Sequence, residues 1–145
     1  MFFWSSSYLM ESIKLIKKYI NKLNATEPSI IREQLKSELP IEHGVYMFMR
    51  KRSKHIDYVG TATGKNGLKQ RVKQHLSPSY DKSVFRIKLS EDKSIPSLTE
   101  QVEHLKRHYL LLFIPIIEHK SIIMAIEQVL IFEKGSIYNN ENFKT

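Results

Sequence analysis

Two short runs of apolar and aromatic residues, each bordered by a glycine, constrain the fold of this 145-residue chain more than any other feature. The first run extends from Gly44 to Met49, and the second extends from Ile56 to Val59. Runs of this length that are rich in valine, tyrosine and phenylalanine are typical of β-strands. We therefore expect two antiparallel strands that pair as a hairpin, joined by the basic connector 50–55.

Most of the other apolar residues recur at steps of three and four, which is the spacing of amphipathic helices. This pattern predicts helices over residues 8–23, about 29–39, 68–76, 83–89, 98–108 and 121–132. A third, buried strand is expected over residues 109–114. The order predicts an α+β domain with a small, mostly antiparallel three-stranded sheet flanked by helices. We expect residues 1–40 to form a helical N-terminal extension and residues 41–145 to form the main domain.

The composition excludes several classes of protein. With no cysteine, the chain has no disulfide framework, no thiol nucleophile and no cysteine-ligated metal centre. A hydrophobic fraction of 41% is ordinary for a globular protein and excludes a disordered chain. No apolar run approaches the roughly 20 residues that span a bilayer, and the opening Met1–Trp4 is too short for a signal peptide. We therefore expect a cytoplasmic protein with no membrane partner.

The positive charge is concentrated in one part of the chain. The formal net charge is +8, from 23 Lys and Arg against 15 Asp and Glu. Between Arg50 and Lys88 basic residues outnumber acidic ones by 11 to 2, whereas the rest of the chain carries 12 against 13. Such a block is the usual electrostatic signature of a polyanion partner, with a solvated, partnerless basic face as the alternative.

Two motifs are incomplete matches to known sites. The loop 60–67 suggests a phosphate-binding P-loop, but only three residues separate Gly60 from Gly64, and Asn66 stands where that motif needs Ser or Thr. His104 and His108 have the i, i+4 spacing of a metalloprotease, but no glutamate follows His104 and no third ligand is evident. We interpret these two histidines as surface residues.

Glu127 is an unusual residue for its surroundings. Its neighbours one helical turn away are all large and apolar: Ile123, Met124, Leu130 and Ile131. A carboxylate in such a setting loses its hydration, and this loss costs free energy unless a metal ion, an arginine or protonation of the carboxylate itself compensates. The alternative is a narrow polar stripe that Glu127 shares with Gln128.

Arg71 and His75 form an i, i+4 pair on the predicted helix 68–76, at the edge of its apolar stripe. An arginine in such a position suits bidentate binding of a phosphate or carboxylate, although a plain surface charge is the alternative. Tyr46 and Tyr58 lie on the two predicted strands, each close to a glycine. Strand tyrosines are usually packing residues, but the glycines would leave the surface open to a ligand.

In this order, the motifs resemble the GIY-YIG nuclease superfamily over about residues 41–140. They are Gly44-Val45-Tyr46, Tyr58-Val59-Gly60, the helix with Arg71 and His75, then Glu127, and finally Tyr138-Asn139. The spacing from Glu127 to Asn139 is similar to that of the repair nucleases in the family, and the Arg71–His75 pair is similar to that of the phage homing endonucleases. Valine replaces isoleucine in both tripeptides, which is a conservative change.

The resemblance implies a metal-dependent endonuclease that hydrolyses phosphodiester bonds of DNA, with RNA left open as a substrate. Tyr46 and Tyr58 would flank the scissile phosphate, and one of them, with Tyr46 preferred, would help to deprotonate the attacking water. Arg71 would neutralise phosphate charge, and Glu127 would bind one Mg²⁺ or Mn²⁺ ion. Magnesium accepts a site with a single protein carboxylate, whereas a tyrosine, with a pKa of about 10, needs nearby cations to act as a base.

The remaining expectations concern the support of the site. His75 would be a proton or hydrogen-bond partner, and Asn139 would order the tail near the site, with Asn140 or Asn142 as alternatives. The residues expected to hold the nucleic-acid backbone are Arg50, Lys51, Arg52, Lys54, Lys65, Lys69 and Lys73. Specificity could come from a homodimer or from a separate protein. A catalytically inactive nucleic-acid-binding module of the same fold is the alternative function.

Overall fold

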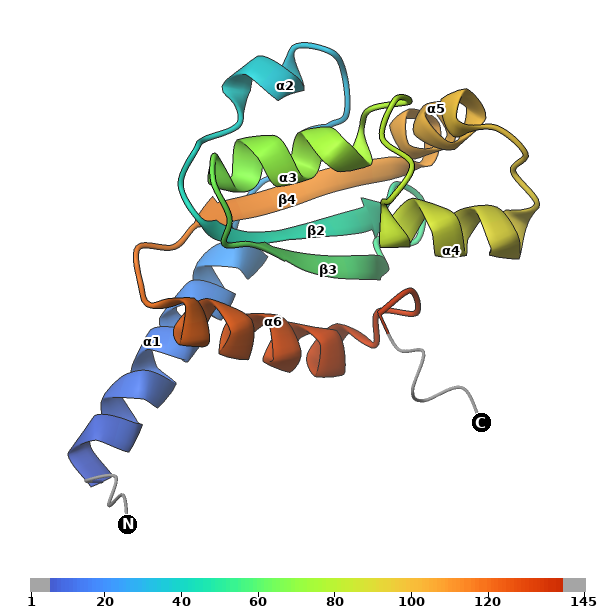
Figure 1. Cartoon of the computed structure of the whole chain (residues 1–145). Helices are drawn as coiled ribbons and strands as arrows, with labels where there is room; N and C mark the ends of the chain where they lie inside the picture. Colours follow the sequence, from blue (N-terminus) through green and yellow to red (C-terminus); the bar gives the residue numbers. More distant parts are fainter. Residues whose placement is uncertain (1–5, 140–145) are drawn as a thin grey trace.

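An antiparallel sheet of four strands forms the centre of the molecule, with helices against both faces (Figure 1). The structure is a computed structural model, and it describes residues 6–139. The strands are β1 (Ser29–Ile30), β2 (Gly44–Arg50), β3 (Ile56–Ala62) and β4 (Tyr109–Pro115). Their spatial order is β1-β4-β2-β3, so that β2 and β4 lie inside the sheet and β3 lies at one edge.

The α+β class is confirmed, whereas the prediction of three strands is wrong. The additional strand is β1, which pairs with β4 through Ser29 and Ile30, and all strand pairs are antiparallel. The sequence pattern predicted a helix from about Ser29, but the helix there begins only at Leu35. A two-residue strand shows no alternation that a sequence pattern could reveal, because its pairing depends on a partner some 80 residues away.

Six helices cover the sheet within the described residues. They are α1 (Ser6–Asn24), α2 (Leu35–Glu38), α3 (Gly67–His75), α4 (Val84–Lys93), α5 (Leu98–His108) and α6 (Lys120–Lys134). Helices α2 to α5 share one apolar core with the sheet, and α1 and α6 share the other. Figure 1 shows α2, α3 and α5 above the sheet and α6 below it. Among the described helices, none is both long and apolar enough to cross a membrane.

Strand β2 is buried along most of its length and faces both cores. Tyr46 and Phe48 belong to the core under α3 and α4, whereas Val45 and Met47 belong to the core under α1 and α6. This alternation follows from the two-residue period of a strand. It directs the Tyr46 side chain towards the same layer as α3.

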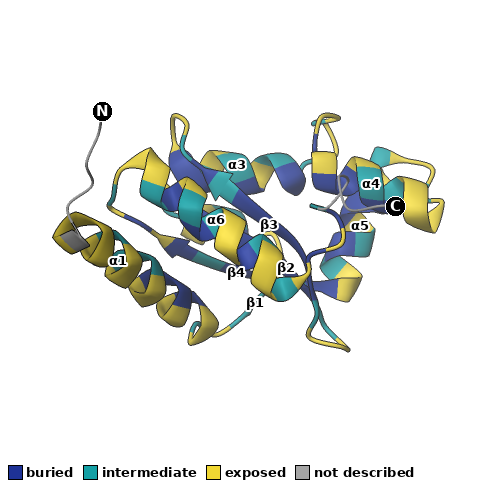
Figure 2. Ribbon diagram, turned by 90° about the horizontal axis from the view of Figure 1, so that it is seen from below, coloured by how far each residue is buried: buried dark blue, intermediate teal, exposed yellow. Residues whose placement is uncertain are grey.

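The N-terminal segment contributes to both cores. Leu23 of α1 is buried beneath the sheet, while Ile31 and Leu35 are buried above it. Figure 2 shows α1 and α6 side by side with their outer faces exposed. From Leu15 to residue 40 the segment is therefore packed against the rest of the molecule, whereas residues 8–10 at the start of α1 are exposed. The domain boundary at residue 41 stays a prediction.

Candidate active site

The pairing of β2 with β3 brings the two strand tyrosines together. Tyr46 lies directly opposite Gly60, and its ring packs over that glycine. A Cβ atom on Gly60 would lie only 2.3 Å from the Tyr46 hydroxyl, so any other residue there would displace the ring. The ring of Tyr58, two residues earlier on β3, has its centroid 6.4 Å from that of Tyr46. The absence of a side chain at Gly60 therefore allows the rings of Tyr46 and Tyr58 to lie close together on the same face of the sheet.

Helix α3 is docked at this place through its first turn. Gly67 has a φ of +45°, and a Cβ there would collide with the carbonyl oxygens of Ile41 and Glu42. The amides of Leu68 and Lys69 donate to the carbonyls of Glu42 (2.9 Å) and Pro40 (2.8 Å), respectively. These bonds satisfy amides that a helix start leaves without intrahelical partners. They fix the orientation of α3 and place Arg71 one turn further along.

Arg71 lies beside both tyrosine hydroxyls. Its guanidinium is half-buried and donates to Gln74 Oε1 at 2.9 Å. Burial opposes its charge, but electrostatic attraction from Tyr46 and Tyr58 raises the pKa of Arg71 above its ordinary value. Arg71 also lines a pocket of about 270 Å³ with Thr61, Gly64 and other residues of the loop after β3. A permanent positive charge is thus held at the wall of an open pocket.

Glu127 reaches the same place from α6, on the other side of the β3 edge. Its half-buried carboxylate interacts electrostatically with Tyr46 and Tyr58. Burial raises the pKa of Glu127, while hydrogen bonding to Gln128 and Thr61 acts in the opposite direction. The apolar surroundings expected from the sequence are present only in part.

The residues around Glu127 differ in burial. Ile123 and Leu130 are buried, whereas Met124 is 53% exposed. The carboxylate therefore lies at the border between the core and solvent, where an ion or a substrate can reach it. Four of the predicted residues, carried by β2, β3, α3 and α6, are brought together in this way: Tyr46, Tyr58, Arg71 and Glu127.

His75 lies behind Tyr46 in the core. The side chain is completely buried, with its Nε2 atom 2.7 Å from the Tyr46 hydroxyl and its Nδ1 atom 2.6 Å from Ser83 Oγ. Burial, reinforced by the positive charges of Arg71 and Arg86, lowers the pKa of His75 to about 3. The imidazole is therefore neutral at physiological pH, with one nitrogen that donates and one that accepts.

Counting hydrogens favours one arrangement of this chain of contacts. Ser83 Oγ accepts a hydrogen bond from the Arg86 amide and has no acceptor other than His75 among residues 6–139. If Ser83 donates to Nδ1, every buried hydrogen of the serine and the histidine is used, and Nε2–H then donates to the Tyr46 oxygen. The opposite tautomer would leave the Ser83 hydroxyl hydrogen without an acceptor, which costs about 1–3 kcal/mol.

Sequence reasoning missed the residues that hold His75. Ser83 caps the N-terminus of α4, and its position before a helical run was the only local signal of that role. Arg86 is 1% exposed and donates to the carbonyls of His75 (3.0 Å), Ser77 (2.7 Å) and Tyr80. Arg86 belongs to the basic block of the sequence, but in the structure its guanidinium holds the loop between α3 and α4. No sequence signal distinguished it from the exposed cations.

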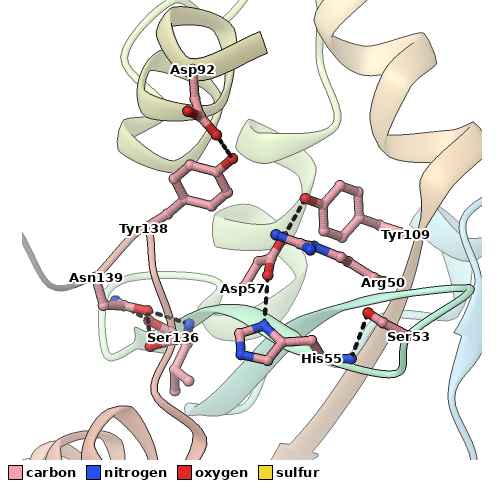
Figure 3. A network of polar contacts seen from close by, with 10 residues as sticks. Arg50, Ser53, His55, Asp57, Asp92, Tyr109, Ser136, Tyr138 and Asn139 are labelled. Atoms are coloured by element: carbon pink, nitrogen blue, oxygen red, sulfur yellow. Dashed lines mark hydrogen bonds and ion pairs between the residues drawn. The ribbon is translucent and has the colours of Figure 1, made fainter.

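Asn139 fastens the end of the described chain to the edge of β3. Its Oδ1 accepts from the Val59 amide at 2.7 Å, and its Nδ2 donates to the Val59 carbonyl at 2.8 Å. Ser136 supplies a further hydrogen bond to the same Oδ1 (Figure 3). The side chain thus completes the pairing of an edge residue next to Tyr58, and its role in ordering the tail stays a prediction. Asn140 and Asn142, the alternatives, lie outside the described residues.

A second polar network fixes the far end of the hairpin (Figure 3). Asp57 is fully buried and accepts from Arg50 (2.7 Å), His55 (2.8 Å) and the Tyr109 hydroxyl (2.5 Å). Its carbonyl also accepts from the Tyr138 amide. Asp57 therefore ties the hairpin to β4 and to the chain end that carries Asn139.

The structure separates the predicted nucleic-acid-binding residues into two groups. Lys65, Lys69 and Lys73 lie on or beside α3, next to the pocket of Arg71. The other group consists of the hairpin residues at the end of β2: Arg50, Lys51, Arg52 and Lys54. A groove of about 600 Å³ along α3 holds Lys69 and Lys73 together with Lys36 from α2. Its lining contains no acidic residue.

The residues around Glu127 are compatible with a divalent ion. Among residues 6–139, no group of three or more acidic or histidine side chains is placed to hold a metal. Glu127 would therefore be its main protein ligand, and water would supply the remaining positions. Mg²⁺ tolerates this, because it usually keeps several waters and uses one or two carboxylates.

In a comparison with protein families, residues 42–142 match the model described as the GIY-YIG catalytic domain. No curated protein matches the chain. The matched range begins just before β2 and contains all the residues that surround the pocket of Arg71.

Proposed function

The chain belongs to the family of proteins with a GIY-YIG catalytic domain, and from this membership we propose that it is a metal-dependent endonuclease that hydrolyses DNA phosphodiester bonds. Membership of the family supports a nuclease-type function in general. The observation that carries the specific proposal is the mutual proximity of Tyr46, Tyr58, Arg71 and Glu127, whose charges and hydrogen bonds act on one another. Of the four, Arg71 lines the pocket beside β3. These residues are spread over some 80 positions of the sequence, and the fold assembles them.

The chemistry of phosphodiester hydrolysis matches these side chains. The reaction needs an attacking water held in line with the leaving oxygen and stabilisation of the charge that spreads over the phosphate. Arg71 supplies a fixed positive charge whose five donors suit phosphate oxygens. Because it is half-buried, its attraction is screened less than that of an exposed arginine.

Tyr46 and Tyr58 would orient the water and the phosphate through their hydroxyl groups. Burial raises the pKa of both, so each is protonated at neutral pH. If His75 Nε2–H donates to the Tyr46 oxygen, the Tyr46 proton is available to the neighbouring Tyr58 hydroxyl. Because Tyr46 is completely buried, it would act on the substrate through Tyr58 and Arg71. To accept a proton from the water, Tyr46 would first have to release its own proton to solvent, and the His75 donor, together with Arg71, would stabilise the resulting phenolate.

Glu127 would hold the divalent ion. When bound, such an ion supplies Lewis acidity that relieves negative charge on the leaving oxygen. The carboxylate's place at the border of the core leaves room for the waters that Mg²⁺ or Mn²⁺ retains.

The groove along α3 is suited to the nucleic-acid backbone. Lys36, Lys69 and Lys73 line it, and it shares Gln70 and Gln74 with the pocket of Arg71. A polyanion that entered the pocket would therefore continue along Lys69 and Lys73, whereas Lys36 is paired with Glu33 at 3.1 Å. Contacts of this kind supply affinity without sequence information.

The experiment that tests the function is cleavage of supercoiled plasmid with Mg²⁺ or Mn²⁺ and with EDTA, by the wild type and Glu127→Ala. We expect nicking or linearisation that requires the metal and is lost in the variant, while the variant still binds DNA in a gel-shift assay. Binding without cleavage of plasmid, branched DNA and RNA by the wild type would instead support an inactive nucleic-acid-binding module. Equal cleavage by both proteins would remove Glu127 from the site.

A further inference from the structure

A second basic pocket lies at the opposite end of β2 from the glycine that begins this strand. Its volume is about 760 Å³, and it is lined by Arg50, Lys51, Arg52, Lys93, His104, Arg107, His108 and Tyr109. These residues come from the hairpin after β2, the end of α4, the end of α5 and the start of β4. Eight lining residues that include five Lys or Arg and no carboxylate form a concentrated positive site.

Several of these cations are not neutralised by neighbours. Arg52, Lys93 and Arg107 are exposed and have no ion pair among residues 6–139. Arg50 is paired with the buried Asp57, and Lys51 donates to the Lys106 carbonyl at 3.1 Å. The two paired residues form the fixed wall of the pocket, and the other three are free to bind a ligand.

The role of basic residues at helix ends accounts for only part of this cluster. Lys93 and Arg107 occupy the last turns of α4 and α5, where a cation stabilises the helix dipole. That effect requires one cation at each helix end, and it gives no reason for Lys51 and Arg52 of the hairpin to converge on the same pocket. The Lys51 amide, bonded to the His108 carbonyl at 2.9 Å, holds the hairpin against α5.

The local charge also affects the histidines. Burial together with the charges of His108, Lys93 and Arg107 lowers the pKa of His104. An adjoining hollow shares His104, Arg107 and His108 but contains Glu100 and Glu103 as well. The acidic residues limit the positive site on that side, so an anion would be held towards Arg52 and Lys93.

We propose that this pocket is a second anchor for the nucleic acid, which binds backbone phosphates at a distance from the cleavage site. The proposal rests on the proposed function, since it assumes the same polyanion. Arg50 follows Tyr46 by four residues on one strand, which separates their Cα atoms by about 13 Å. A duplex rises 3.4 Å per base pair, so about four base pairs cover this distance. One duplex could therefore reach both sites.

The test compares two variants that lose the same charge. Arg52→Gln/Lys93→Gln/Arg107→Gln removes the free cations of the pocket, while Lys17→Gln/Lys18→Gln/Lys22→Gln removes three exposed lysines of α1. Affinity for a duplex of about three helical turns is measured by fluorescence anisotropy over a range of salt concentrations. Hydrolysis of bis(p-nitrophenyl) phosphate, which is too small to reach the pocket, is measured in parallel.

We expect the pocket variant to lose about tenfold or more in affinity and its salt slope to fall by about 2–3, or about 0.9 for each lost phosphate contact. The α1 variant should keep the wild-type affinity and slope, and all three proteins should hydrolyse the small ester equally. Equal affinities and slopes of the two variants would overturn the anchor. No cleavage of plasmid DNA and no hydrolysis of the small ester by any protein, with the difference in binding intact, would overturn the endonuclease proposal alone and support the anchor.

Discussion

The hydroxyl of Tyr46 lies 2.7 Å from Nε2 of His75, and both side chains are completely buried. One comes from the middle of the sheet and the other from the last turn of α3, 29 residues further along. A buried polar pair of this kind has no water with which to exchange its hydrogen bond, so loss of one partner leaves the other unsatisfied. The contact connects the candidate active site to the interior of the protein.

We expect His75→Leu to reduce the cleavage rate by about 10- to 100-fold, because Tyr46 loses the donor that orients its hydroxyl and stabilises its phenolate. Single-turnover kinetics on plasmid DNA would measure the effect. Ser83→Ala should act in the same direction, and the double variant should lose less than the product of the two single effects, since both act through one chain of contacts. Independent effects would argue against the proposed chain.

The stability of the protein should depend on pH through His75. Its pKa is about 3 in the folded protein and about 6.5 when unfolded, so between these values the unfolded state binds the extra proton. The stability that the neutral, buried imidazole contributes is present above pH 6.5 and falls by up to about 1.4 kcal/mol per pH unit towards pH 3. Urea titrations at pH 7.5 and pH 5 would measure this. The free energy of unfolding should change less between the two pH values for His75→Gln than for the wild type.

Gly60→Ala should both destabilise the protein and impair cleavage, because the new Cβ would lie 2.3 Å from the Tyr46 hydroxyl. Overpacking of this kind costs about 1–3 kcal/mol. Gly64→Ala is the matched control, since nothing lies within 4 Å of its Cβ position. Thermal melts would compare the two, and equal melting temperatures would contradict the packing of Tyr46 over Gly60. Plasmid cleavage by Gly60→Ala is compared with that of the wild type, because Gly64 itself lines the pocket of Arg71.

Arg71→Ala should lower the cleavage rate by about 10²-fold or more, as expected for the loss of a group that stabilises transition-state charge. Arg71→Lys should recover only part of the rate, because an ammonium group lacks the planar pair of donors. Lys120→Ala, an exposed residue at the start of α6, provides a surface control. Cleavage rates for Arg71→Ala within a few-fold of the wild type would limit α3 to a structural role.

Tyr46→Phe and Tyr58→Phe would distinguish the two tyrosines, since each keeps the ring and removes only the hydroxyl. We expect the larger loss of cleavage for Tyr46→Phe, because Tyr46 has the His75 contact. Single-turnover rates across pH 6–9 would compare the variants. A fully active Tyr46→Phe protein would transfer the role of base to Tyr58 or to solvent.

Much of the candidate site could be proposed from the sequence because its residues lie in local motifs. Tyr46 and Tyr58 occur beside glycines in strand-like runs, and Arg71 lies on a helix whose apolar stripe is evident from its spacing. Ser83 and Arg86 could not be found in this way, because each acts through contacts with the preceding helix or loop that no periodicity records. Strand β1 was missed for the same reason, since its pairing with β4 is its only distinguishing feature.

The sequence by itself determined the α+β class, most helices, the hairpin and the order of the motifs, since these follow from local spacing of apolar residues and from glycines. Only the tertiary structure decided the role of each charged residue. Within one basic block, Lys69 and Lys73 lie in the groove along α3, and Arg52 lies in the second basic pocket. Arg86 is buried and donates hydrogen bonds to backbone carbonyls. Net charge is a sum over residues, whereas binding depends on which charges share a surface, and chain folding brings together residues that are distant in sequence.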